Sequence, residues 1–168
     1  KKIVDRTGNV FEETVVQSEQ VIDPRIAFLS TYVMQDVVTS GTGTRVRSIG
    51  RPVAAKTGTT NDSRDAWFIG ATPSLIAGIW VGFDQEASLG AEEVGGRTAA
   101  PIWLYFMEKV LQNTPVESFP VPEGIVFEKV NPQTGASVGA SDKGINEAFL
   151  IGSSPNSSLT DEIKGLFR

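Results

Sequence analysis

Histidine and cysteine are both absent from the 168 residues of the chain. Without histidine, neither a Ser-His-Asp nor a Cys-His catalytic arrangement can form within it. Without cysteine, the chain has no thiolate nucleophile, no disulfide and no cysteine-based zinc site. Any covalent chemistry must therefore use lysine, serine, threonine, tyrosine or carboxylate side chains.

Positive charge is also in short supply, with 15 lysines and arginines against 20 aspartates and glutamates and a net charge of −5. Proteins that bind nucleic acid use clustered basic side chains to neutralise phosphates, so we expect no nucleic-acid partner. Hydrophobic residues make up 40% of the chain and charged residues 21%, which is the balance of an ordinary globular domain.

One long uncharged run, residues 66–83, approaches the length of a membrane span. It contains glycines at several positions, and Thr72-Pro73-Ser74 is typical of a turn. Two buried strands over residues 66–71 and 75–83, joined by this turn, therefore explain the run better than a transmembrane helix.

Apolar periodicity predicts two helices. The first begins with Asp23 as N-cap and Pro24 at the first helical position, and it ends near Gly41. The second begins near Thr98 and Pro101. The expected buried stripe of the first consists of Ile26, Leu29, Val33 and Val37, with Met34 and Val38 beside them. The expected buried face of the second consists of Ile102, Trp103, Phe106 and Val110.

The remaining pattern predicts antiparallel strands. Residues 3–11 read as a hairpin with its turn at Thr7-Gly8-Asn9, and residues 125–130 read as one short strand. A strand over residues 52–58 would join the two strands of the uncharged run in a three-stranded meander. The expected fold class is therefore α+β, an antiparallel sheet flanked by helices. We expect Trp67, Trp80 and Trp103 in the core and a structural pair of Arg64 with Asp65.

The triplet Lys56-Thr57-Gly58 is the sharpest chemical feature of the sequence. Lys-Thr-Gly is a signature of penicillin-recognising enzymes with an active-site serine. Taken alone, the triplet is a weak signal and is better explained by an exposed strand end that carries a solvated lysine. Residues 50–57 also come close to a phosphate-binding loop. Ala55 replaces the second glycine of that motif and a turn rather than a helix follows Gly58, so nucleotide binding is disfavoured.

The surroundings of the triplet resemble the C-terminal half of the transpeptidase domain of class A, bifunctional penicillin-binding proteins. The similarity spans roughly residues 22–155, and its most specific part is residues 41–103. The matching segments are 41–43, 56–60, 61–68, 78–84, 95–97, 99–103, 121–125 and 131–135. The resemblance implies part of a serine β-lactamase/D,D-transpeptidase-like fold.

The resemblance also implies roles for individual residues. Lys56 would lie beside the nucleophilic serine, and the backbone N–H of Thr59 would be one donor to the developing oxyanion. The hydroxyls of Thr57 and Thr59 would bind the terminal carboxylate of the substrate. Gly58 would let the substrate backbone lie against the strand, and Thr60, also counted as substrate-binding, would shape the turn.

Two motifs of the family have no counterpart in the expected place. No serine is followed by lysine three positions later, and Ser154-Pro155-Asn156 matches the Ser-x-Asn motif only after Lys-Thr-Gly, which we regard as coincidence. We therefore expect an upstream part of the same protein to carry both motifs, and the fragment alone to be inactive. The family's glycosyltransferase domain and N-terminal membrane anchor are not in this sequence, so membrane contact is expected only through such an anchor.

The resemblance implies a D,D-transpeptidase that cross-links peptidoglycan stem peptides ending in D-Ala-D-Ala and is acylated by β-lactams. It implies an extracytoplasmic location at the bacterial inner membrane and no metal or organic cofactor. The alternatives are a serine β-lactamase or D,D-carboxypeptidase, and a non-catalytic binding or scaffold module. We expect residues 1–113 to belong to the transpeptidase domain, 114–151 to form an extended segment packed on it, and 152–168 to form a flexible tail.

Overall fold

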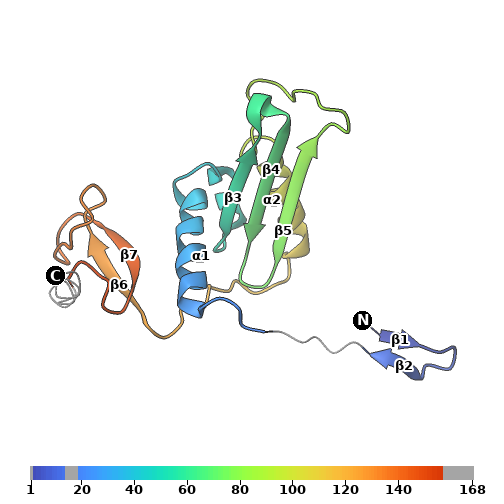
Figure 1. Ribbon diagram of the computed structural model, residues 1–168, viewed down its shortest axis with the longest axis horizontal. Helices are drawn as coiled ribbons and strands as arrows, with labels where there is room; N and C mark the ends of the chain where they lie inside the picture. Colours follow the sequence, from blue (N-terminus) through green and yellow to red (C-terminus); the bar gives the residue numbers. More distant parts are fainter. Residues whose placement is uncertain (1, 14–18, 157–168) are drawn as a thin grey trace, which may run out of the picture.

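The computed structural model of the chain describes residues 2–13 and 19–156. Figure 1 shows a small N-terminal hairpin, a central sheet flanked by helices, and a second hairpin near the C-terminus. All strand pairs in these ranges are antiparallel. The expected α+β class is confirmed.

The N-terminal hairpin pairs β1 (Lys2–Val4) with β2 (Val10–Glu13). Its turn is held by the carboxylate of Asp5, which accepts hydrogen bonds from the backbone N–H of Thr7 at 2.8 Å and of Asn9 at 2.9 Å. The side chains of Thr7 and Asn9 add further hydrogen bonds, and together these lower the pKa of Asp5 to about 2. The predicted hairpin and its turn are confirmed.

Helix α1 (Pro24–Thr39) begins as the sequence predicts. The side chain of Asp23 caps it by accepting a hydrogen bond from Arg25 N at 2.8 Å, and proline occupies the first turn. Arg25 also pairs with the Asp23 carboxylate, and its hydrogen bonds hold the pKa of that carboxyl near 2. The chain then passes through residues 41–43 into the short 3₁₀ helix η1 (Thr44–Ile49).

The buried face expected for α1 is wrong in part. Val33 is 64% exposed and Ile26 is 46% exposed. The buried residues of the helix are Val38, which belongs to the expected stripe, and Phe28, which does not. The reason is that α1 does not lie flat on one sheet. Its C-terminal end joins the central core through Val38, while Phe28 packs toward the C-terminal hairpin.

The central sheet is the predicted three-stranded meander. It consists of β3 (Ala54–Thr59), β4 (Asp65–Ala71) and β5 (Ile76–Gly82), in the order β3-β4-β5. The register sets Thr57 opposite Phe68. Side chains therefore alternate between two faces of the sheet, one turned toward α2 and one left open.

The uncharged run that could have suggested a membrane span forms β4, a turn and β5. The turn is closed by a hydrogen bond from Thr72 N to Leu75 O at 2.8 Å. Within residues 2–13 and 19–156, no helix is long and apolar enough to cross a membrane.

Helix α2 (Ala99–Val110) covers one face of the sheet and completes the core. The rings of Trp103 and Phe68 meet edge to face at 5.4 Å, and Trp103 Nε1 donates a hydrogen bond to Ala77 O at 3.0 Å. This contact requires a glycine on β4, since a Cβ at Gly70 would lie 2.6 Å from the Trp103 ring. The buried core residues around them are Val38, Val46, Val53, Ala55, Phe68, Ala99, Ala100, Trp103, Met107 and Leu111.

The buried face expected for α2 is also largely wrong. Of its four residues only Trp103 is buried, while Ile102, Phe106 and Val110 are each exposed by 45–48%. The helix is apolar on two sides, and the side that meets the sheet carries two small residues, Ala99 and Ala100. Small side chains allow the helix backbone to approach the strands closely, so this is the side that packs against the sheet.

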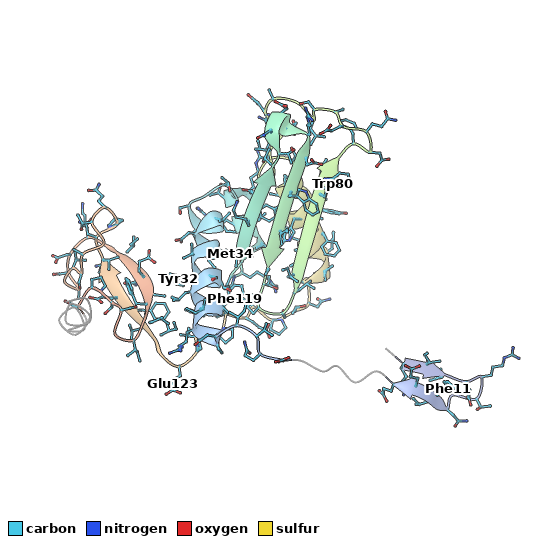
Figure 2. All side chains as sticks on the ribbon, in the orientation of Figure 1. Phe11, Tyr32, Met34, Trp80, Phe119 and Glu123 are labelled. Atoms are coloured by element: carbon cyan, nitrogen blue, oxygen red, sulfur yellow. The ribbon has the colours of Figure 1, made fainter. Side chains whose placement is uncertain are left out.

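Two of the three tryptophans expected in the core lie instead on the open face of the sheet. Trp67 is 42% exposed and Trp80, labelled in Figure 2, is 44% exposed, with their ring centroids 6.5 Å apart. Trp80 Nε1 donates to the carboxylate of Asp65 at 2.9 Å. Arg64 does not pair with that carboxylate as expected, because it forms ion pairs with Glu86 at 2.5 Å and Asp62 at 3.3 Å.

The second hairpin pairs β6 (Ile125–Val130), which the sequence predicted, with β7 (Ile145–Leu150), which it did not. It lies against α1, from which Tyr32 points toward it in Figure 2. The ring centroids of Phe127 and Tyr32 lie 5.8 Å apart, and Tyr32 Oη donates a hydrogen bond to Asn146 O at 2.6 Å. Strands β6 and β7 are thereby joined to the helix that precedes the site.

The segment after β7 is described only as far as residue 156. Ser153 N donates to Leu150 O at 3.0 Å, and Asn156 Nδ2 donates to Ser137 Oγ at 3.0 Å. Most of the tail expected to be flexible, residues 157–168, lies outside the described residues.

Candidate active site

The Lys-Thr-Gly strand lies at an edge of the central sheet. Within the described parts of the chain, β3 pairs with β4 and with no other strand. Thr60 N donates to Asp65 O at 3.2 Å, which makes residues 60 and 65 a hydrogen-bonded pair. Such pairs alternate along antiparallel strands. The N–H and C=O groups of Thr57 and Thr59 therefore point away from β4, toward the open edge.

Lys56 brings a positive charge to this edge. Its side chain starts on the opposite face of the strand from Thr57, because neighbouring residues alternate. The ammonium nevertheless reaches the edge, where Nζ donates to Thr57 O at 2.6 Å. The side chain is exposed, so the charge is available to a ligand that lies along β3.

The hydroxyls of Thr57 and Thr59 share one face of β3, and each is held by a loop from elsewhere in the chain. Thr57 Oγ1 lies 2.9 Å from Thr42 Oγ1, in the loop between α1 and η1. Thr59 Oγ1 accepts a hydrogen bond from Gly95 N at 3.2 Å, in the loop before α2. Two loops that are distant from each other in sequence thus converge on the strand.

Close backbone contacts explain the glycines around the site. A Cβ at Gly95 would lie 2.1 Å from Trp67 O, and a Cβ at Gly96 would lie 2.2 Å from Thr42 O. At Gly58 a Cβ would meet the Trp67 Cβ at 3.2 Å, a tighter contact than is usual. Glycine at positions 95 and 96 lets the loop before α2 lie directly on the β3–β4 pair and on the loop that contains Thr42.

Thr60 leaves the strand and holds the following turn. Its hydroxyl accepts a hydrogen bond from Asp65 N at 2.9 Å and lies 3.3 Å from Asp65 Oδ2. The turn contains the 3₁₀ segment η2 (Asn61–Ser63). A polar hollow of about 560 Å³ opens at this end of β3. Its lining residues are Thr59, Thr60, Asn61, Asp62, Arg64, Asp65 and Glu86.

The structure brings the residues singled out in the sequence to one strand end. Residues 56–59 line the edge of β3, and Thr60 belongs to the turn. Sequence reasoning did not single out Thr42, although a threonine between two glycines just before the strand was a usable signal. In the described ranges, no group of three or more acidic side chains is placed to hold a metal ion.

Comparison with known proteins shows a consistent similarity. Residues 1–107 match the model of the penicillin binding protein transpeptidase domain. The chain is 37% identical over 161 residues to penicillin-binding protein 1A of Aquifex aeolicus, an alignment that covers 96% of this chain and 22% of that protein. It is 41% identical over 138 residues to penicillin-binding protein 1A of Pseudomonas aeruginosa, covering 82% of this chain and 16% of that protein.

A solved structure is similar as well. The crystal structure of penicillin-binding protein 1A from Haemophilus influenzae superposes with a TM-score of 0.76 and 29% sequence identity, over 85% of this chain and 22% of that one. The chain therefore spans about a fifth of the length of the proteins it matches.

Proposed function

The chain belongs to the penicillin-binding protein transpeptidase domain family, and on that premise we propose that it supplies the Lys-Thr-Gly strand of a serine D,D-transpeptidase. The nucleophilic serine, in a Ser-x-x-Lys motif, and the Ser-x-Asn motif come from an upstream part of the same protein. The substrate is a peptidoglycan stem peptide ending in D-Ala-D-Ala, which locates the reaction on the extracytoplasmic side of the bacterial inner membrane. No metal or organic cofactor takes part.

The proposed reaction has two acyl-transfer steps. The serine oxygen attacks the carbonyl carbon of the penultimate D-alanine, the peptide C–N bond breaks, and the departing nitrogen takes a proton and leaves as free D-alanine. An amine of a second stem peptide then attacks the ester carbon and releases the serine, which regains its proton. A β-lactam enters the same first step, but its amide nitrogen stays tethered after the ring opens.

Each residue of the edge has a role that its geometry supports. The ammonium of Lys56 stabilises negative charge that develops beside the serine, and the edge-facing N–H of Thr59 donates to the oxyanion. The Thr59 hydroxyl accepts from Gly95 N, so its own hydrogen is free for the substrate carboxylate. The Thr57 hydroxyl donates to the same carboxylate, and Gly58, which has no Cβ, lets the substrate backbone lie against the strand.

One observation carries the proposal more than any other. A lysine ammonium, two threonine hydroxyls and the edge-facing N–H groups of Thr57 and Thr59 lie together at one edge of β3, which has no partner strand on that side within residues 2–13 and 19–156. A substrate backbone can add to that edge as a further strand, since β-strand addition needs free N–H and C=O groups in register.

The fate of the acyl-enzyme in the complete protein tests the proposal. A transpeptidase should hold the penicilloyl group for far longer than one catalytic cycle, and it should release D-alanine from a stem peptide faster when an amine acceptor is present. Rapid, repeated penicilloyl release would instead identify a serine β-lactamase. Release of D-alanine at a rate independent of added amine would indicate a D,D-carboxypeptidase.

A further inference from the structure

The hydroxyl of Thr42 lies within hydrogen-bond distance of the proposed carboxylate-binding residue Thr57. The two Oγ1 atoms lie 2.9 Å apart, and either one can be the donor. Thr42 comes from the loop between α1 and η1, fifteen positions before its partner. Its side chain is exposed, so a ligand can approach the pair from solvent.

The position of Thr42 is fixed by close backbone packing on both sides. Gly43 N donates to Val37 O at 2.8 Å, and a Cβ at Gly43 would lie 3.1 Å from the same oxygen. A Cβ at Gly41 would lie 2.9 Å from Val37 Cα, and Gly96 crosses directly over Thr42 O. The loop is therefore held between the end of α1 and the loop before α2.

Hydrogen-bond accounting gives this pair a function. Two hydroxyls carry two hydrogens, and one is used between them. If Thr57 donated to Thr42, its hydrogen would not be available to a carboxylate. A carboxylate only accepts hydrogen bonds, so it favours the opposite arrangement, in which Thr42 donates to Thr57 and Thr57 donates to the ligand. A hydroxyl that accepts one hydrogen bond also becomes a better donor.

We propose that Thr42 is a positioning residue of the carboxylate subsite, which directs the hydroxyl hydrogen of Thr57 toward the terminal carboxylate of a D-alanyl peptide or the carboxylate of a β-lactam. This inference rests on the proposed function, because it assigns the carboxylate to Thr57. Thr42 itself touches no reacting atom.

The test compares two probes in the complete protein: benzylpenicillin, which carries the carboxylate, and its methyl ester, which does not. Thr42→Val should slow acylation by benzylpenicillin about tenfold, the effect of weakening one hydrogen bond to a charged group. The same variant should leave acylation by the methyl ester unchanged. Thr42→Ser, which keeps the hydroxyl, should restore most of the rate with benzylpenicillin.

Two further variants separate the possible outcomes. Thr44→Val, an exposed threonine just after the same loop, controls for a general effect of the substitution and should match the unmodified protein. Thr57→Val should slow acylation by benzylpenicillin. Adding Thr42→Val to that variant should lower the acylation rate little further. If Thr57→Val is slow but Thr42→Val is not, or if acid and ester are slowed equally, the role of Thr42 is refuted. If Thr57→Val also has no effect, the proposed carboxylate site fails together with it.

Discussion

Single residues in the site are placed by contacts that the local sequence does not reveal. The triplet at residues 56–58 and its strand are visible in the sequence, and so is the turn at Thr60. The pairing of Thr57 with Thr42 depends on a loop fifteen positions away. Which backbone groups of β3 point to its open edge depends on the register of β3 with β4, and only the folded sheet fixes that register. The candidate residues could be named from the sequence, but their partners in the fold could not.

Gly95 provides a prediction at the scale of one residue. Gly95→Ala would place a Cβ 2.1 Å from Trp67 O, so the loop before α2 must move away from the strands. We expect a lower melting temperature of the complete protein and slower acylation by penicillin, because Gly95 N no longer reaches Thr59 Oγ1. Thermal unfolding together with acylation rates measures both effects.

Gly78→Ala is the matched control for that substitution. It introduces the same methyl group on β5, where the nearest atom, Ile69 Cγ1, would be at an ordinary 3.5 Å. The control should unfold at nearly the same temperature as the unmodified protein. Equal melting temperatures for the Gly95 and Gly78 variants would contradict the close contact of this loop with β4.

Among the elements, helix ends were predictable and buried helix faces were not. Asp23 and Pro24 mark the start of α1 through their own local chemistry. The buried side of α2 depends on its neighbours, since both of its sides are apolar and only the one with Ala99 and Ala100 meets the sheet. Strand β7 was missed for a similar reason. Its sequence, Ile145–Leu150, alternates only weakly between polar and apolar residues, so the strand is specified mainly by its pairing with β6.

The contact between α1 and β7 leads to a prediction about pH. Burial raises the pKa of Glu147, and the charge of Asp36 raises it further. Burial, Glu147 and Asp36 also raise the pKa of Tyr32 at the same contact. The folded protein thus favours protonated Glu147, so docking of the hairpin is strongest at low pH and weakens as the pH rises through this raised pKa.

Glu147→Gln removes the titrating charge and should strengthen the contact at neutral pH. Amides of β6 and β7 should exchange with solvent more slowly in this variant than in the unmodified protein at pH 7, and equally fast near pH 4. Glu117→Gln, an exposed residue between α2 and β6, is the control and should change nothing. If Glu147→Gln left the exchange rate at pH 7 unchanged, the ionised Glu147 carboxylate would not destabilise the contact between α1 and β7.

In the part of the chain that the structure describes, the central domain exposes large apolar surfaces, and β3 and β5 are the unpaired edges of the central sheet. The open face of the sheet exposes Trp67, Ile69, Ile76 and Trp80, and the outer side of α2 exposes Ile102, Tyr105, Phe106 and Val110. Contiguous apolar surface of this kind marks an interaction site, and unpaired edge strands promote association. The composition alone predicted a globular domain and gave no sign of these surfaces.

The isolated chain should therefore self-associate, and an upstream segment with the Ser-x-x-Lys motif should convert it into a defined complex. Light scattering at several concentrations, with and without that segment, measures the change in size. If the isolated chain were a monodisperse monomer of 18.0 kDa that unfolds cooperatively, these surfaces would not need a second segment to bury them.

The central claim is that Lys56 works in an acyl-transfer site, and the acylation rate of the complete protein by a fluorescent penicillin tests it most directly. Lys56→Ala should slow labelling by roughly two to three orders of magnitude, the usual loss when one preorganised electrostatic group is removed. Lys143→Ala, an exposed lysine near β7, should label normally, and the isolated chain, which lacks the nucleophile, should not label. Equal labelling rates for Lys56→Ala and the unmodified protein, with equal thermal stability, would contradict the account and leave Lys56 as a solvated surface lysine.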